Sequence, residues 1–296
     1  MTDFEPRGRI VVGVDGTAPS QAALRWALRR AERDGTELVL AHVVDDAFGE
    51  MGSTYGADAR NAARELLDRT RAEVADDHAQ VKISSVLTDG SVAWALAHAT
   101  RPGDLLVIGT HKTGYLHGRV LGSRSVQIAT AAPCDVAVVP DVELRFRRGV
   151  VAGIDRAMTA ESVARAAALE AAGLGDEVLF LHATPRIPGA GVESVRADTA
   201  QNDVVTTAVR AARQIHPQLE IRARIAHRDP AEVLLDAARD RALLVLGPGS
   251  LEPTRSPIGS VLHDVLLNVN APVLIARTGH GPAVLDADAH VGATAR

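Results

Sequence analysis

Short aliphatic runs rich in β-branched residues alternate along the first half of the chain with longer Ala-rich or amphipathic segments. The short runs predict five strands and the longer segments predict four helices between them. Strands that alternate with helices of this length form right-handed βαβ units, so they predict a parallel sheet with helices on both faces. The expected strands are residues 9–15, 37–43, 81–87, 104–109 and 136–139, and the expected helices are residues 21–33, 61–77, 91–100 and 123–131.

The second half of the chain repeats this pattern. The run RIVVGVD at 9–15 reappears as GVVAGID at 149–155, and ELVLAHV at 37–43 reappears as EVLFLHA at 177–183. Because the offset between matching segments changes only slightly, the halves are whole-domain duplicates. We expect an α/β protein with domains at residues 1–144 and 149–277, a short polar connection at 145–149 and a flexible tail at 278–296.

Composition narrows the class of protein. Hydrophobic residues make up 46% of the chain and aromatic residues only 3%, so the core must consist of Ala, Val, Leu and Ile. The net charge is −5, with Lys and Arg spread along the chain, which argues against DNA or RNA as a partner. Cys134 is the single cysteine, so no intrachain disulfide forms and a reducing compartment is expected. Without a signal-like or membrane-length apolar run, the expected location is the cytoplasm, with no membrane insertion.

A glycine-rich loop follows the fourth predicted strand and ends at an amphipathic helix. Its glycines are Gly109, Gly114, Gly118 and Gly122. Glycine lets the backbone approach a ligand closely, and the free N–H groups of a helix N-terminus bind phosphate. Ser123 and Ser125 lie at that N-terminus, where their hydroxyls can also meet phosphate oxygens, although Gly122-Ser123 alone is also an ordinary helix start. Ligands of parallel sheets bind beyond the carboxyl ends of the strands, where this loop lies.

Asp15 ends the first predicted strand, just before Gly16 and Thr17. It either caps the following helix or turn, or faces a ligand. Its repetition as Asp155, at the same edge of the second sheet, favours the ligand role.

Other polar and aromatic residues are interpreted as structural. His42 and His182 lie within aliphatic strands and are predicted to be buried and hydrogen-bonded, and Trp26 and Trp94 are predicted to belong to the core. The remaining candidates lack partners: no metal-ligand spacing surrounds His111 or His117, and no histidine pattern makes Cys134 a nucleophile.

These segments resemble a tandem universal stress protein of the actinobacterial kind over both halves of the chain. The resemblance is carried by residues 11–17, by Ala22, Leu24, Trp26 and Ala27, by the strand 40–44 and by the loop 109–125. It implies two Rossmann-like domains of the adenine nucleotide alpha hydrolase kind, each with a five-stranded parallel sheet. Members that bind ATP share a loop of Gly, two residues, Gly, nine residues, Gly and Ser or Thr. Gly109 and Gly122-Ser123 fit this spacing, but Lys112 replaces the middle glycine and either faces a phosphate or narrows the loop.

The resemblance implies a stress-response regulator that binds ATP or a related adenine nucleotide, with or without Mg²⁺, mainly in the N-terminal domain. Asp15 would lie beside the adenosine, the main chain of Val43 would contact adenine, and Ser123 and Ser125 would bind phosphate. It also implies that the final strands, 136–139 and 273–276, pair within the chain as a pseudo-dimer, leaving a homodimer and an unidentified protein partner open. The expected binding residues are Asp15, Gly16, Val43, Gly109, Lys112, Gly118, Gly122, Ser123, Arg124 and Ser125, and in the second half Asp155, Gly247, Gly259 and Ser260.

The second copy of the loop, 247–262, is expected to hold nucleotide less well. It is one residue shorter and contains three prolines, each of which removes a backbone donor. Glu252 adds a negative charge, Leu262 replaces the equivalent of Ser125, and Arg228 falls where the first half has Gly90.

No catalytic set emerges from the sequence. The loop lacks the Gly-Lys-Ser/Thr of a P-loop and follows the fourth strand, and no nucleophile elbow is present. The segment at 14–17 also differs from the Ser-Gly-Gly-x-Asp-Ser loop of adenylating pyrophosphatases. We therefore expect binding without catalytic or metal-ligating residues, with two alternatives: an interaction or dimerisation module that binds no nucleotide, and a slow ATPase.

Overall fold

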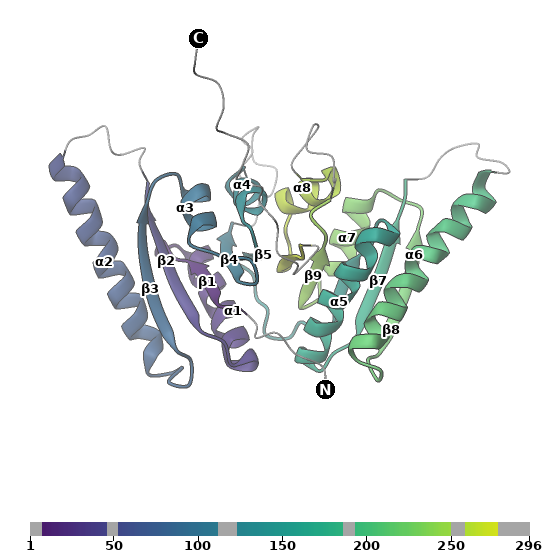
Figure 1. The fold of residues 1–296 in the computed structure, drawn as a ribbon, viewed down its shortest axis with the longest axis horizontal. Helices are drawn as coiled ribbons and strands as arrows, with labels where there is room; N and C mark the ends of the chain where they lie inside the picture. Colours follow the sequence, from purple (N-terminus) through teal and green to yellow (C-terminus); the bar gives the residue numbers. More distant parts are fainter. Residues whose placement is uncertain (1–7, 46–52, 112–122, 186–192, 250–257, 278–296) are drawn as a thin grey trace, which may run out of the picture.

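A computed structural model describes residues 8–45, 53–111, 123–185, 193–249 and 258–277, and strands alternate with helices throughout (Figure 1). The first half consists of β1 (Ile10–Gly13), α1 (Ala18–Asp34), β2 (Leu38–Val44), α2 (Ser53–Ala75), β3 (Ile83–Asp89), α3 (Val92–His98), β4 (Leu105–Thr110), α4 (Ser123–Ala131) and β5 (Asp135–Pro140). The second half consists of β6 (Val150–Gly153), α5 (Ala157–Leu174), β7 (Val178–Ala183), α6 (Glu193–Ile215), β8 (Ile221–Ala226), α7 (Pro230–Ala238), β9 (Leu243–Leu246), α8 (Ser260–Leu267) and β10 (Val273–Ile275).

All these strands form one sheet in the order β3-β2-β1-β4-β5-β10-β9-β6-β7-β8. Neighbours within each half are parallel, and the two halves join where β5 and β10 pair antiparallel, with Val138 opposite Val273 and Val136 opposite Ile275. The predicted α/β class, the two five-stranded parallel sheets and the pairing of the final strands are confirmed.

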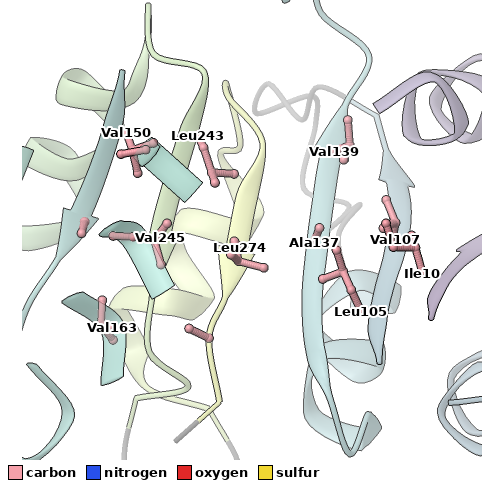
Figure 2. Packing of buried hydrophobic residues seen from close by; sticks show 14 of the residues in the cluster. Ile10, Leu105, Val107, Ala137, Val139, Val150, Val163, Leu243, Val245 and Leu274 are labelled. Carbon is pink, nitrogen blue, oxygen red and sulfur yellow. The ribbon is translucent and has the colours of Figure 1, made fainter. Parts of the chain in front are cut away.

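The core has two layers because successive strand residues point to opposite faces of the sheet. Val12 packs in the layer that includes α1, α2, α5 and α6, whereas Val11 packs in the layer that includes α3, α4, α7 and α8. Figure 2 shows part of the first layer, with Val107, Ala137 and Leu274 on adjacent strands across the junction of the halves. Each layer therefore continues from one half into the other.

Arginine side chains also join the halves outside the sheet, through an ion pair with Glu170 and through hydrogen bonds to backbone carbonyls. Glu170 of α5 is 4% exposed and receives hydrogen bonds from both terminal nitrogens of Arg30 and from Arg33, residues of α1. Arg277, just after β10, donates to the carbonyls of Ala129 and Thr130 in α4, and burial lowers the pKa of its guanidinium. The V-shaped arrangement of the halves in Figure 1 is therefore held by charge contacts as well as by strand pairing.

The prediction that Trp94 belongs to the core is wrong. The short helix α3 buries Ala93, Leu96 and Ala97, while Trp94 is 63% exposed and lies 6.1 Å from the ring of His98. Trp26 is half-buried against the core, with the Arg30 guanidinium 5.5 Å from its ring.

The predicted tail at 278–296 lies outside the described residues. In the described part of the chain, no helix is long and apolar enough to cross a membrane.

Candidate functional site

Asp15 follows β1 and forms a tight turn that starts α1. Its Oδ1 accepts hydrogen bonds from the Thr17 N–H at 3.0 Å and from the Thr17 hydroxyl at 2.7 Å. The Thr17 hydroxyl in turn caps α1 by accepting from the Ser20 N–H, and Gly16 supplies the positive φ of 79° that the turn requires. The turn interpretation of Asp15 is therefore confirmed, and its carboxylate is exposed at the carboxyl edge of the sheet.

Two histidines hydrogen-bond to the backbone carbonyls of the residues that directly precede Asp15 and Asp155. The His42 Nδ1 lies 2.6 Å from the Val14 carbonyl oxygen, and the His182 Nδ1 lies 2.8 Å from the Ile154 carbonyl oxygen. A carbonyl only accepts, so Nδ1 carries the proton in both rings. His182 is buried as predicted, and His42 is half-buried. Sequence reasoning did not assign this positioning role, although the repeated separation of 28 residues was available as a sign of it.

Gly109, at the end of β4, is required by packing. A Cβ at this position would lie 2.2 Å from the carbonyl oxygen of Pro19 in the first turn of α1. In the second half, a Cβ at Gly247 would lie 3.3 Å from a methyl group of Val163, which is a much milder contact. Packing against α1 therefore explains why a glycine stands at position 109, a reason that the sequence did not reveal.

The other expected residues of the first half that the structure describes lie at the same edge of the sheet. Val43 is half-buried in β2 and pairs with Thr88. Helix α4 begins at Ser123, as predicted, with Arg124 exposed and Ser125 only 5% exposed. Three expected residues lie outside the described part of the chain, namely Lys112, Gly118 and Gly122.

The four expected residues of the second half line one pocket of about 230 Å³. Asp155 follows β6, Gly247 follows β9, and Gly259 and Ser260 start α8. The structure therefore brings together positions that are separated by about a hundred residues in the sequence. Sequence reasoning missed most of the apolar wall, which includes Val163, Leu181, Ala183, Leu234 and Leu246.

The turn after β6 differs from the turn after β1. Ala157 stands where the first half has Thr17, and helix α5 has Arg156 as its N-cap without a side-chain capping bond. The Arg156 guanidinium instead lies 3.3 Å from the Asp155 carboxylate. The two aspartates thus occupy the same place with different partners.

Two observations concern the metal and cysteine candidates of the sequence. Within residues 8–45, 53–111, 123–185, 193–249 and 258–277, no group of three or more His, Cys, Asp or Glu side chains is arranged to hold a metal ion. Cys134 is buried just before β5, and burial raises the pKa of its thiol. A raised pKa favours the unreactive thiol over the nucleophilic thiolate.

Both halves of the chain match the same family of known proteins. A family model described as the universal stress protein family matches residues 6–140 and 147–277. A universal stress protein of Mycolicibacterium smegmatis is 27% identical over 283 residues, which cover 90% of this chain and 96% of that protein. One from Mycobacterium tuberculosis is 26% identical, covering 93% and 96% respectively. A crystal structure of a universal stress protein from Archaeoglobus fulgidus has a TM-score of 0.70 at 15% identity and covers 93% of this chain and 97% of that chain.

Proposed function

The chain belongs to the universal stress protein family, and we propose that it binds an adenine nucleotide, preferentially ATP, at the carboxyl edge of its N-terminal half. Nucleotide occupancy would regulate a stress response by changing the conformation of the chain or its choice of protein partner. The proposal assigns no catalytic residue.

The pocket of the second half is the observation that supports this proposal most strongly. Its lining combines the residue after the first strand of that half, the end of the fourth strand and the start of the following helix. The first half repeats that topology, with Asp15, Gly109 and Ser123 at the matching positions. We infer that a ligand lies against the same three elements in the first half.

The first half has the polar groups that a phosphate chain needs. Arg124 supplies an exposed positive charge in the first turn of α4, and Ser125 supplies a hydroxyl where the second half has Leu262. The N-terminus of α4 adds free N–H groups and a partial positive charge.

Asp15 is suited to the sugar, because a carboxylate accepts hydrogen bonds from ribose hydroxyls. Mg²⁺, when bound with ATP, would neutralise phosphate charge; oxygen ligands suit it, and most would come from the phosphates and water.

Calorimetric titration of the full chain with ATP tests the proposal. Asp15→Asn keeps an acceptor for the Thr17 N–H but weakens the acceptor for ribose, so we expect affinity to fall about tenfold, or about 1.4 kcal/mol. Arg124→Ala should weaken binding of ATP more than binding of adenosine, because a guanidinium stabilises the charged phosphates and adenosine carries none. Mass spectrometry of the denatured purified chain would also detect nucleotide retained from the cell. No heat on titration, together with no retained nucleotide, would contradict the proposal and favour the interaction module.

A further inference from the structure

The pocket of the second half has apolar walls and a polar rim. Val163, Leu181 and Leu246 form part of its wall, while its polar lining includes Asp155, Arg156, Thr159 and Ser260. Its volume of about 230 Å³ lies below the range of about 300–1,000 Å³ that is usual for sites enclosing drug-sized ligands. A pocket of this size and lining suits one flat apolar ring system with a few polar substituents.

The backbone at the mouth of this pocket is closed on itself. The N–H of Gly259, at the start of α8, donates to the carbonyl of Pro248 at 3.2 Å. A Cβ at Gly249 would lie 2.4 Å from the Gly259 nitrogen, so the two ends of the loop are in direct contact. A donor that would face a phosphate in an open loop is therefore already used, and Pro248 has no N–H to offer.

The side chains at the mouth also disfavour a phosphate chain. Leu262 occupies the first turn of α8 and lines the pocket where the first half has Ser125. In the first turn of α8, Val261 stands where the first half has the positively charged Arg124. Arg156 also lines the pocket, but its charge is paired with the Asp155 carboxylate at 3.3 Å. Hydroxyl groups, in contrast, can donate to the Asp155 carboxylate.

We propose that this pocket, lined by Asp155, Ala183 and Leu262, is a second binding site that takes an uncharged nucleoside and discriminates against nucleotides. The proposal extends the proposed function, on which it rests for the adenine class of ligand. The two halves then bind ligands that share a base and sugar but differ in phosphate content. Such a chain responds to two related small molecules through one continuous sheet.

Titration of the full chain with adenosine, and separately with ATP, tests this assignment using two matched variants. Ala183 lines the pocket at the end of β7, and Val43 is its counterpart in β2. Ala183→Trp fills the second pocket and Val43→Trp fills the corresponding place in the first half. We expect two adenosine sites in the unmodified chain and one in each variant. ATP binding should be unchanged in Ala183→Trp and at least tenfold weaker in Val43→Trp.

The two proposals fail in different ways. An adenosine titration that Ala183→Trp leaves unchanged overturns the second site, even if Val43→Trp removes ATP binding. The second site's preference for an uncharged nucleoside is overturned if Val43→Trp still binds ATP as tightly as adenosine and the double variant Val43→Trp/Ala183→Trp binds neither. Absence of ATP binding in the unmodified chain overturns only the proposed function, provided that adenosine binding is retained in Val43→Trp and lost in Ala183→Trp. Circular dichroism shows whether Ala183→Trp folds. If it does not, the smaller substitution Ala183→Leu takes its place.

Discussion

Gly109 is a single residue that affects both the packing of α1 on β4 and the position of the candidate site. Its hydrogen in place of a side chain lets the first turn of α1 approach β4, because a Cβ would meet the Pro19 carbonyl at 2.2 Å. That approach also brings the Asp15 turn, which precedes α1, close to the end of β4. The glycine therefore contributes to the candidate site through the position of a helix, whether or not it contacts a ligand.

Replacing Gly109 by alanine should destabilise the chain by about 2–3 kcal/mol, the upper part of the usual range of about 1–3 kcal/mol for overpacking, because the added methyl group meets backbone atoms. Gly247→Ala is the matched control, because its Cβ would meet only a Val163 methyl at 3.3 Å and should cost less than about 1 kcal/mol. Urea denaturation followed by circular dichroism measures both. Equal costs for the two variants would show that the first turn of α1 yields to the added methyl group.

At the scale of elements, the alternation of aliphatic runs and Ala-rich segments was sufficient to predict the parallel sheets. Buried strands such as β4 and β9 are almost continuous aliphatic runs, so their pattern is unambiguous. The edge strand β3 was less well placed: Val81 is buried in a turn, and the strand extends from Ile83 to Asp89. Trp94 was misplaced because a seven-residue helix has too few turns to reveal which face is buried.

The candidate site was less predictable than the elements. Repetition of Asp15 as Asp155 located the edge, and the pocket in the second half brings the expected residues of that half together. The contact between Gly109 and Pro19 and the closure at Gly259 depend on distances between segments remote in sequence. Such contacts leave no local pattern, so single-sequence reasoning could not supply them.

The position of Cys134, just before β5, gives a prediction for that element. Burial excludes reagents and raises the pKa of the thiol, so the thiolate fraction at neutral pH is smaller than that of a free cysteine. Alkylation by iodoacetamide should be at least a hundredfold slower in the native chain than in urea, and should accelerate as pH rises toward the raised pKa. Because this is the single cysteine, intact-mass spectrometry reports it directly. Native labelling as fast as unfolded labelling would show that β5 is open to solvent.

The molecule as a whole consists of two duplicated halves fused into one sheet. Both core layers cross the junction, and the cluster of Glu170 with Arg30 and Arg33 bridges α5 and α1. Shared layers and shared charges predict that the halves unfold together, although each has its own candidate site. This coupling gives a physical route by which a ligand in one half affects the other.

Glu170→Gln tests the bridge between the halves. Without the Glu170 carboxylate, the guanidiniums of Arg30 and Arg33 must share the buried Asp34 carboxylate, which lies 3.5 Å from Arg30 and 2.8 Å from Arg33. We therefore expect a loss of about 3 kcal/mol in the free energy of unfolding, at the low end for a broken buried ion pair. Glu161→Gln is the control, since its pair with Arg165 is exposed and should contribute less than about 0.5 kcal/mol. Calorimetric melting should show one transition in the unmodified chain. Two separate transitions there would contradict the coupling of the halves.

Hydrogen–deuterium exchange of the full chain with and without ATP shows which half holds a bound nucleotide, so it is a direct test of nucleotide binding in the first half. Bound ATP should slow exchange at residues 10–17, at 38–44 and at the start of α4. Exchange at the matching residues 150–157 and 178–183 should change little. Protection confined to the second half, or no protection in either half at saturating ATP, would contradict nucleotide binding in the first half.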